Sequence, residues 1–403
     1  MKRILYLVCL SALLSCVDYN DATQPLSLSV KLQAPEEFIQ SAGLDGREIA
    51  LLKGSQRITA TTDANGVATF SDVIPDIYDL SVSWQLTADE YHALTGDPQV
   101  VGGCTVSGSL NSRLIKEPET IMLPTQLSIN RDIIIGKIYY AGSKDDNNRT
   151  YMAGKYVELY NQSDDSVDVS GLYIGLVEAE STQAYTLENL HEVYADSVVL
   201  LKQVFRIPAN APHLVAPGGT VLLVNSAINH QANGYALEQD LSDADFEAKD
   251  ASGKMQNNPS TPALELIYTM YPSVSNMNLV QSGPCSVVIF RTDDDVTAYQ
   301  RTYPYGKTTG NQWLLLPKRH VIDGVEVLRL KNTGIDVSSK RLYDDIDAGY
   351  TNISAVSGWN AEVVYRTTAK HATDGRAILT DTNNSSNDFK TSTTIKPREY
   401  DEE

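Results

Sequence analysis

Hydrophobic and polar residues alternate with a period of two along much of the chain, which is the pattern of β-strands that bury one face. The alternation is clearest over residues 26–32 and 78–84. Between these segments, the turn sequence Asp63-Ala64-Asn65-Gly66 predicts a tight hairpin, because Asn-Gly accommodates the positive φ angles that such a turn requires. Short strands separated by turn residues at this spacing predict a β-sandwich.

The second half of the chain contains longer apolar segments that we also expect to be strands. They are residues 133–140, 155–163, 167–174, 214–225, 264–268, 285–290, 313–317, 325–330, 363–366 and 374–379. Gly171 and the pair Gly218-Gly219 are expected in turns that a β-carbon would forbid. Four residues are expected to point inward from these strands: Val157, Leu159, Leu172 and Leu222.

Residues 227–262 differ from their surroundings because they are rich in Asn, Gln, Asp and Ser and contain few large apolar residues. We expect a long polar insertion with one turn of helix over residues 243–249. Loops of this length inside a domain are usually functional or mobile. The insertion is therefore a candidate for ligand contact.

Two stretches resemble known β-sandwich modules. Residues 61–70, a Pro-containing turn and the strand 78–82 resemble the prealbumin-like module of carboxypeptidase regulatory regions over about residues 24–125, with Pro124 at the boundary. The segment Tyr156–Asn161, the corner 168–172 and the turn 216–219 resemble the lamin-tail domain, an immunoglobulin-like sandwich, over 132–226. The resemblance implies an all-β chain: an immunoglobulin/prealbumin-like sandwich over 24–126 and a larger lamin-tail-like body over 127–403.

The start of the chain reads as a secretory signal. Lys2 and Arg3 precede an apolar run that ends at Leu14, and this run is shorter than the roughly 20 residues a membrane-spanning helix needs. Leu13-Leu14-Ser15-Cys16 resembles the lipobox of bacterial lipoproteins. The resemblance implies that residues 1–15 are removed, that Cys16 is acylated, and that residues 16–23 form a tether.

Acidic residues close behind Cys16 are similar to the surface-export signals of Bacteroidetes lipoproteins, which implies an outer-membrane protein that faces outward. At the other end, Arg366, Gly375-Arg376 and the run 381–389 resemble the C-terminus of an uncharacterised Bacteroidetes lipoprotein family that combines both modules. This resemblance implies architecture and location, and it transfers no chemistry.

The charge balance excludes one class of partner. The chain has 32 Lys and Arg residues against 51 Asp and Glu, a net charge of -19, and loss of Lys2 and Arg3 with the leader would make it -21. Nucleic-acid binders need a basic stripe, and this sequence has none. Cys104 and Cys285 remain after the leader and the anchor, either as a disulfide or as two separate buried thiols.

No nucleophile motif is present in the sequence. There is no Gly-x-Ser-x-Gly elbow, and no second histidine four residues after His191, so we expect no catalytic residues and no resident cofactor. Asp344, Asp345 and Asp347 could supply oxygen ligands to Ca²⁺. A solvated acidic turn is the alternative for this cluster.

Tyrosine is abundant, with 22 residues against 9 Trp and Phe together. Tyrosine provides a large contact area at low entropic cost, as binding loops require. Five tyrosines in expected loops are therefore a candidate ligand surface, with ordinary packing as the alternative: Tyr268, Tyr271, Tyr299, Tyr303 and Tyr305.

The sequence favours a non-enzymatic, outer-membrane-anchored surface lipoprotein that binds a ligand or a partner protein through loops of the second domain. A role as an accessory to an outer-membrane transporter follows only by analogy with lipoproteins of this kind. One alternative is a structural or adhesive surface lipoprotein, and another is a metal-dependent hydrolase that uses the aspartates.

Overall fold

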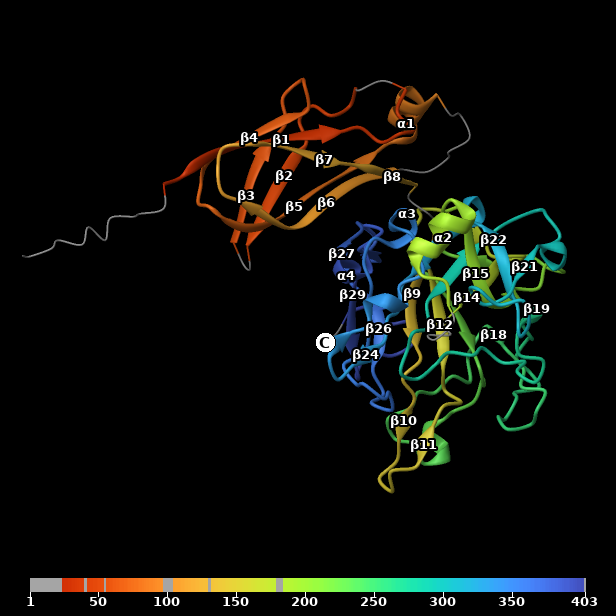
Figure 1. Ribbon diagram of the computed structural model, residues 1–403. Coiled ribbons are helices and arrows are strands. Elements are labelled where there is room, and N and C mark those ends of the chain that lie inside the picture. The colour runs from red at the N-terminus through yellow and green to blue at the C-terminus, as the bar shows by residue number, and fades with distance from the viewer. Residues whose placement is uncertain are drawn as a thin grey trace, which may run out of the picture. The chain divides into compact units, whose positions relative to one another are not determined.

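The computed structural model describes residues 24–39, 42–53, 56–96, 104–129, 132–178 and 184–401, so Cys16 and the expected leader lie outside the described residues. They form two compact units (Figure 1). Unit 1 falls within Met1–Pro98 and Val106–Leu127, and unit 2 within Gln99–Thr105 and Ser128–Glu403. Among the described residues, no helix combines the length and apolar character that a membrane crossing requires.

The described residues of unit 1 form two sheets and one α-helix. The three-stranded sheet has the order β4-β1-β7 and the five-stranded sheet the order β3-β2-β5-β6-β8. The bounds are β1 Leu26–Gln33, β2 Glu48–Lys53, β3 Gln56–Thr61, β4 Val67–Val73, β5 Asp76–Leu86, α1 Ala88–Thr95, β6 Cys104–Ile115, β7 Thr120–Pro124 and β8 Gln126–Ile129.

The core of unit 1 follows from the period-two pattern. In β1 the apolar residues are buried while most of the polar residues between them are exposed, and Leu28, Val30, Phe70 and Leu80 from both sheets join one buried cluster. β1 pairs antiparallel with β4 and parallel with β7. The alternation therefore reports correctly which face of these strands is buried.

The predicted hairpin at residues 63–66 is wrong, although the turn itself exists. Gly66 has φ +72°, and Asp63 accepts hydrogen bonds from the backbone amides of Asn65 and Val67. The turn joins β3 of the five-stranded sheet to β4 of the three-stranded sheet. The chain changes sheets here because β4 carries the buried Ala68 and Phe70, whereas β3 is almost entirely exposed.

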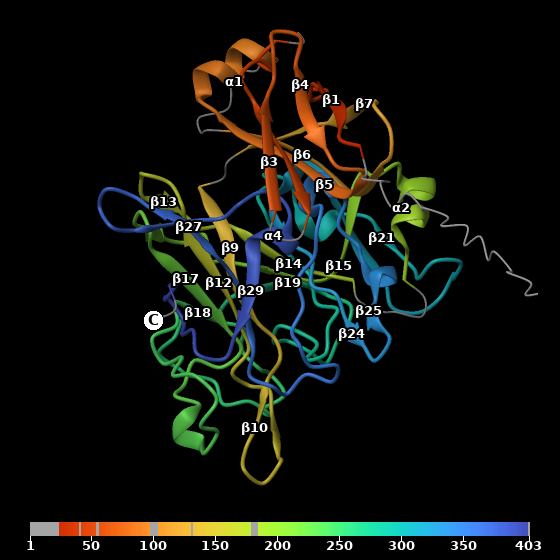
Figure 2. The same ribbon diagram turned by 90° about the vertical axis from the view of Figure 1, so that its left-hand side faces the viewer.

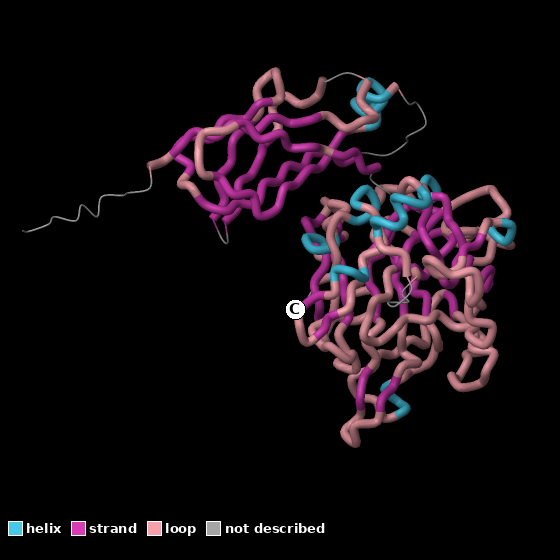
Figure 3. The backbone as a smooth tube through the Cα atoms, viewed as in Figure 1, coloured by secondary structure: helices cyan, strands magenta, loops and turns pink. Residues whose placement is uncertain are grey.

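Unit 2 is built around two larger sheets, and long loops connect and surround its strands (Figure 3). The six-stranded sheet has the order β18-β17-β12-β9-β26-β29, and several of its strands are seen side by side in Figure 2. Its bounds are β9 Ile133–Tyr139, β12 Tyr156–Asn161, β17 Thr220–Val224, β18 Phe246–Glu247, β26 Val363–Arg366 and β29 Phe389–Ser392.

The seven-stranded sheet has the order β21-β22-β15-β14-β20-β23, and β19 also pairs with the long strand β15. Its bounds are β14 Tyr173–Val177, β15 Val198–Arg206, β19 Glu265–Thr269, β20 Val287–Phe290, β21 Arg301–Thr302, β22 Trp313–Pro317 and β23 Val321–Val325. All of its pairings are antiparallel.

Smaller elements surround these sheets. The two-stranded ribbons are β10 Ser143–Lys144 with β11 Thr150–Tyr151, β13 Val167–Asp168 with β16 Leu214–Val215, β24 Leu330–Lys331 with β25 Gly334–Ile335, and β27 Thr368–His371 with β28 Ala377–Leu379. The α-helices are α2 Leu187–Tyr194, α3 Asp344–Asp347 and α4 Ser385–Asp388. The 3₁₀-helices are η1 Gln231–Asn233, η2 Val296–Ala298, η3 Lys318–His320 and η4 Val337–Ser339.

The strands of unit 2 are apolar without alternation because both faces of each large sheet are covered. The largest core lies between the sheets and contains the four residues that were expected to point inward. A second core covers the other face of the seven-stranded sheet with Leu190 of α2 and Ile346 of α3. The other face of the six-stranded sheet packs against Leu379 and Tyr400, so every residue of β9 is buried.

The segment 227–262 is not a detached polar loop, and the helical turn expected over 243–249 is wrong. Phe246 and Glu247 form β18, which pairs parallel with β17 and extends the six-stranded sheet. Leu241 and Phe246 are buried in the central core. The buried Glu247 carboxylate accepts hydrogen bonds from the backbone amides of Ala227 and Asn258. Hydrogen bonds to this buried carboxylate therefore help to hold a segment that has few large apolar residues to pack.

Other sequence expectations are also resolved. Gly171 and Gly218 have φ +73° and +72°, as expected, whereas Gly219 does not take a positive φ. Cys104 and Cys285 are both buried and are not joined by a disulfide. At a coarse level the all-β prediction is confirmed, because the chain is mostly β-strand in several largely antiparallel sheets.

Candidate functional site

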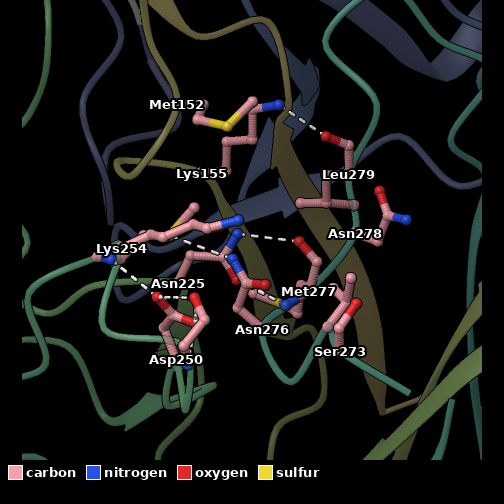
Figure 4. Close-up of a pocket in the computed structure, with 13 residues that line it drawn as sticks. Met152, Lys155, Asn225, Asp250, Lys254, Ser273, Asn276, Met277, Asn278 and Leu279 are labelled. Carbon is pink, nitrogen blue, oxygen red and sulfur yellow. Dashed lines mark hydrogen bonds between the residues drawn. The ribbon is translucent and has the colours of Figure 1, made fainter. Parts of the chain in front are cut away.

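Unit 2 contains a cavity of about 230 Å³ (Figure 4). One wall is the loop 250–255 of the polar segment, and the other is the loop 273–279 that follows β19. Residues at the ends of β12 and β17 complete it. The lining consists of Met152, Lys155, Asn225, Asp250, Ser252, Lys254, Met255, Ser273, Val274, Asn276, Met277, Asn278 and Leu279.

Two buried amide side chains hold the 273–279 wall. Asn225, directly after β17, donates through Nδ2 to the Met277 carbonyl at 2.9 Å and accepts from the Met277 amide at 2.8 Å. Gln203 of β15 donates to the carbonyls of Val274 and Asn276 and accepts from the Asn278 amide at 2.7 Å. These amides replace the strand partners that the loop backbone lacks, so the wall is fixed without a sheet.

The 250–255 wall is organised by one carboxylate. Asp250 accepts from the Ser252 amide at 2.9 Å, from the Ser252 hydroxyl at 2.7 Å and from the Met255 amide at 2.8 Å. Burial acts to raise the pKa of Asp250, but these hydrogen bonds hold that pKa below its ordinary value. The carboxylate is ionised and already engaged by its own loop.

The two walls are also tied to each other. The Ser275 hydroxyl accepts from the Ala251 amide at 2.7 Å and donates to the Lys249 carbonyl at 2.9 Å. The Asn276 amide group donates to the Met255 sulfur at 3.1 Å. The cavity is therefore largely pre-formed, as small-molecule sites usually are.

Lys155 is the most unusual residue of the lining. Its side chain is buried, with the whole residue 2% exposed, and Nζ donates to the Leu279 carbonyl at 2.7 Å. Burial lowers the pKa of Lys155 to about 8, although Cys285 and Glu238 act to raise it. No carboxylate in the described part of the chain lies within ion-pairing distance of this ammonium group.

Three methionines give the cavity its apolar surface: Met152, Met255 and Met277. Methionine is unbranched and polarisable, so it adapts to ligands of differing shape. Met277 is buried, whereas Met152 is 42% exposed. The lining thus combines apolar contact area with amide and ammonium donors.

None of the five candidate tyrosines lines this cavity. The Tyr268 hydroxyl donates to the Gln312 carbonyl, and Tyr299 stacks on His320 with ring centroids 6.3 Å apart. Tyr305 is 39% exposed, packs edge-on against Tyr185 and donates to Glu192 at 3.2 Å. Tyr271 and Tyr303 are half-buried. The contacts of Tyr268, Tyr299 and Tyr305 fit the packing alternative.

The three candidate calcium ligands do not converge. Asp344 faces Lys340, and Asp345 pairs with Lys318 at 2.6 Å. Asp347 is buried and accepts hydrogen bonds from the amides of Glu326, Gly349 and Ser385. Across the described ranges no group of three or more acidic, His or Cys side chains is arranged to hold a metal ion. The α3 turn points the aspartates in different directions.

Sequence reasoning missed both the cavity and a buried ionic cluster around Arg366, although Arg366 itself carries part of the family resemblance. Arg366 donates through Nη1 to Asp381 and Asp388, each at 3.0 Å, and through Nη2 to Asp323 at 3.3 Å. Burial raises the pKa of Asp388 to about 7, against the lowering effect of Arg366. The C-terminal pattern that carried the family resemblance therefore contains Arg366 and two of its three aspartate partners, Asp381 and Asp388, whereas Asp323 lies outside that pattern.

Comparisons with known proteins agree with this architecture. Residues 216–396 match a family described as protein of unknown function (DUF4876). The chain is similar in structure to a DUF4876 family protein from Bacteroides thetaiotaomicron VPI-5482, with a TM-score of 0.57 and 20% sequence identity over 91% of this chain and 95% of that chain.

A DUF3823 family protein from Parabacteroides merdae ATCC 43184 aligns with 46% of this chain and 92% of its own length, at 12% identity and a TM-score of 0.16, too low to support a structural argument. No curated protein matches the chain. The matched region 216–396 contains both cavity walls, whereas Met152 and Lys155 precede it. Residues 216–396 are therefore similar to the DUF4876 family, and most of the chain is similar in fold to a DUF4876 protein from Bacteroides.

Proposed function

We propose that this chain is a non-enzymatic binding protein that holds a small ligand in the cavity of unit 2. The observation that carries the proposal is a pre-formed cavity with unused hydrogen-bonding groups. Gln203 and Asn225 fix the 273–279 wall, and Asp250 fixes the 250–255 wall. A ligand would therefore meet an ordered site and lose little free energy to ordering it.

Several lining groups are free to contact a ligand. Within the described part of the chain, the side chains of Lys254, Ser273 and Asn278 have no hydrogen-bond partner, and Lys155 has only Leu279. Cavities of this type with a few convergent polar groups are the usual binding sites, and at about 230 Å³ this one lies below their usual range of about 300–1,000 Å³. The ligand is therefore a small molecule.

The chemistry near the cavity favours binding over catalysis. Burial raises the pKa of the Cys285 thiol to about 12, which keeps this sulfur protonated and unreactive. The carboxylate of Asp250 is engaged by its own loop. Neither group is poised as a nucleophile or a general base.

We infer that unit 1 is a prealbumin-like module and that unit 2 is a lamin-tail-like, immunoglobulin-like sandwich. The three- and five-stranded sheets around one core support the first assignment. The two large sheets that enclose the central core of unit 2 support the second. In this arrangement unit 1 is a spacer, and unit 2 carries the site.

The proposal includes the location expected from the leader. Acylated Cys16 would anchor the chain in the outer membrane with unit 2 facing outward, where a captured ligand could be passed to a transporter. The net charge of -19 is consistent with a soluble body held by a lipid anchor.

Native mass spectrometry of the full chain, purified from its own outer membrane, tests the binding proposal. Ser273 is exposed at the cavity rim, so Ser273→Trp should obstruct it, while Ser166→Trp in the exposed turn after β12 is the matched control. We expect a small-molecule adduct on the wild type and on the control that is absent from Ser273→Trp. An adduct of equal mass and occupancy on all three proteins, or on none, would contradict the proposal.

A further inference from the structure

The charge of the cavity is opposite to that of the chain. The chain carries a net charge of -19, yet the ionisable lining residues are Lys155, Lys254 and Asp250. Because the Asp250 carboxylate already accepts from Ser252 and Met255, the two ammonium groups are not matched by a free anion. Figure 4 shows the Lys254 side chain pointing from its loop into the group of lining residues.

Lys155 differs from the other buried lysine whose contacts are defined. Lys137 is fully buried and pairs with Glu158 at 2.7 Å, beneath the ring of Tyr400. Lys155 has the Leu279 carbonyl alone, so two of its three N–H groups have no partner within the described residues. A buried charge is costly unless it is paired and hydrogen-bonded. The missing partner is an anion.

We propose that the cavity binds a small organic acid whose carboxylate accepts the two remaining N–H groups of Lys155 and whose short apolar part lies against Met152 and Met277. This inference rests on the proposed function and names the ligand class of that site. Lys254 and the Asn278 amide also line the cavity and add polar groups around the bound acid.

The lining favours a carboxylate over a phosphate. Phosphate sites in proteins are usually built from arginine forks or from several backbone amides at a helix N-terminus. This cavity has neither, and its three methionines provide contact for an apolar group. A singly charged ligand with an aliphatic tail matches one buried ammonium group and a thioether surface.

Binding should be linked to protonation of Lys155. The titratable groups around this ammonium are Lys202 of β15, Glu238 and Cys285, and an added carboxylate favours the charged form of the lysine. With a pKa of about 8 in the free protein, Lys155 is largely charged at pH 7 and largely neutral at pH 9. The affinity for a carboxylate should therefore fall by about tenfold between these pH values.

Isothermal titration calorimetry of the full chain tests the inference. The probes are propionate, butyrate and hexanoate, each with its neutral primary amide, and inorganic phosphate. We expect at least one carboxylate to bind and its amide to bind at least tenfold more weakly. In Lys155→Met this difference in affinity between carboxylate and amide should disappear. Lys370→Met, at an exposed position of β27, is the matched control and should bind as the wild type does.

The wild-type pH series keeps the test decisive if Lys155→Met does not fold. Equal binding of amide and carboxylate, preference for phosphate, or an affinity unchanged from pH 7 to pH 9 would overturn the inference and leave the cavity as a binding site for another ligand. Absence of binding by every carboxylate would also overturn it. If the adduct blocked by Ser273→Trp is absent as well, the proposed function falls too.

Discussion

Asn225 and Met277 are joined by two hydrogen bonds, with the Asn225 amide donating to the Met277 carbonyl at 2.9 Å and its oxygen accepting from the Met277 amide at 2.8 Å. The Asn225 side chain therefore gives the loop backbone the two hydrogen bonds that a neighbouring strand would give it in a sheet. Both residues line the cavity. The order of the binding wall depends on this pair.

Replacing Asn225 should loosen the wall locally. In Asn225→Ala the buried amide and carbonyl of Met277 lose their partners, at a cost of about 1–3 kcal/mol for each group. We expect the Met277 amide to exchange its hydrogen at least about tenfold faster, measured by hydrogen–deuterium exchange. Asn332→Ala at an exposed position is the control, and equal exchange in the two variants would show that the pair does not order the loop.

Lys155 should make stability depend on pH in the alkaline range. Its pKa is about 8 when folded and about 10.5 when unfolded, so the folded state binds fewer protons between these values. The destabilisation is fully present below pH 8 and is relieved as the pH rises to 10.5. Relative to Lys155→Met, the free energy of unfolding of the wild type should rise by about 3 kcal/mol from pH 7 to pH 10.5. Both free energies are measured by chemical denaturation across this pH range. If they change with pH in parallel, other groups in the free protein already stabilise the Lys155 ammonium group, and the prediction is contradicted.

The Arg366 cluster should be essential for unit 2. Arg366→Met leaves the buried Asp323 and Asp388 and the half-buried Asp381 without the guanidinium, and we expect a loss of about 3–5 kcal/mol in the free energy of unfolding. Asp388→Asn is the matched variant. With its pKa raised to about 7, Asp388 is largely protonated at pH 6, so an amide should cost only about 1 kcal/mol there. Similar losses in both variants at pH 6 would contradict this description of the cluster.

Much of the fold could be predicted from the sequence because strand patterns are local. The alternation in β1 and β5 and the apolar runs of β9, β12, β20 and β22 identify strands and buried faces. The predicted hairpin at residues 63–66 is wrong because a turn sequence does not show which sheet the next strand joins. Helix α1 is not among the predicted elements, although the capping box of Thr87 and Glu90 marks its start.

The binding site could not be predicted because its parts are distant in the sequence. Lys155, Asn225, the loop 250–255 and the loop 273–279 meet only through tertiary pairing. In contrast, the tyrosine and aspartate candidates were chosen for proximity in sequence. Tyr268 and Asp347 turn inward and are engaged by Gln312 and Ser385, because spacing alone does not show where a side chain points.

The most direct test of the central claim is a crystal structure of the protein purified from its own host, examined for electron density in the cavity. We predict density larger than a water molecule, bounded by Met277 and Met152 and within hydrogen-bond distance of Lys155 Nζ. Two observations together would contradict the assignment of this cavity as the ligand site. The wild-type density would fit only separate water molecules, and crystals of Ser273→Trp would show the same density.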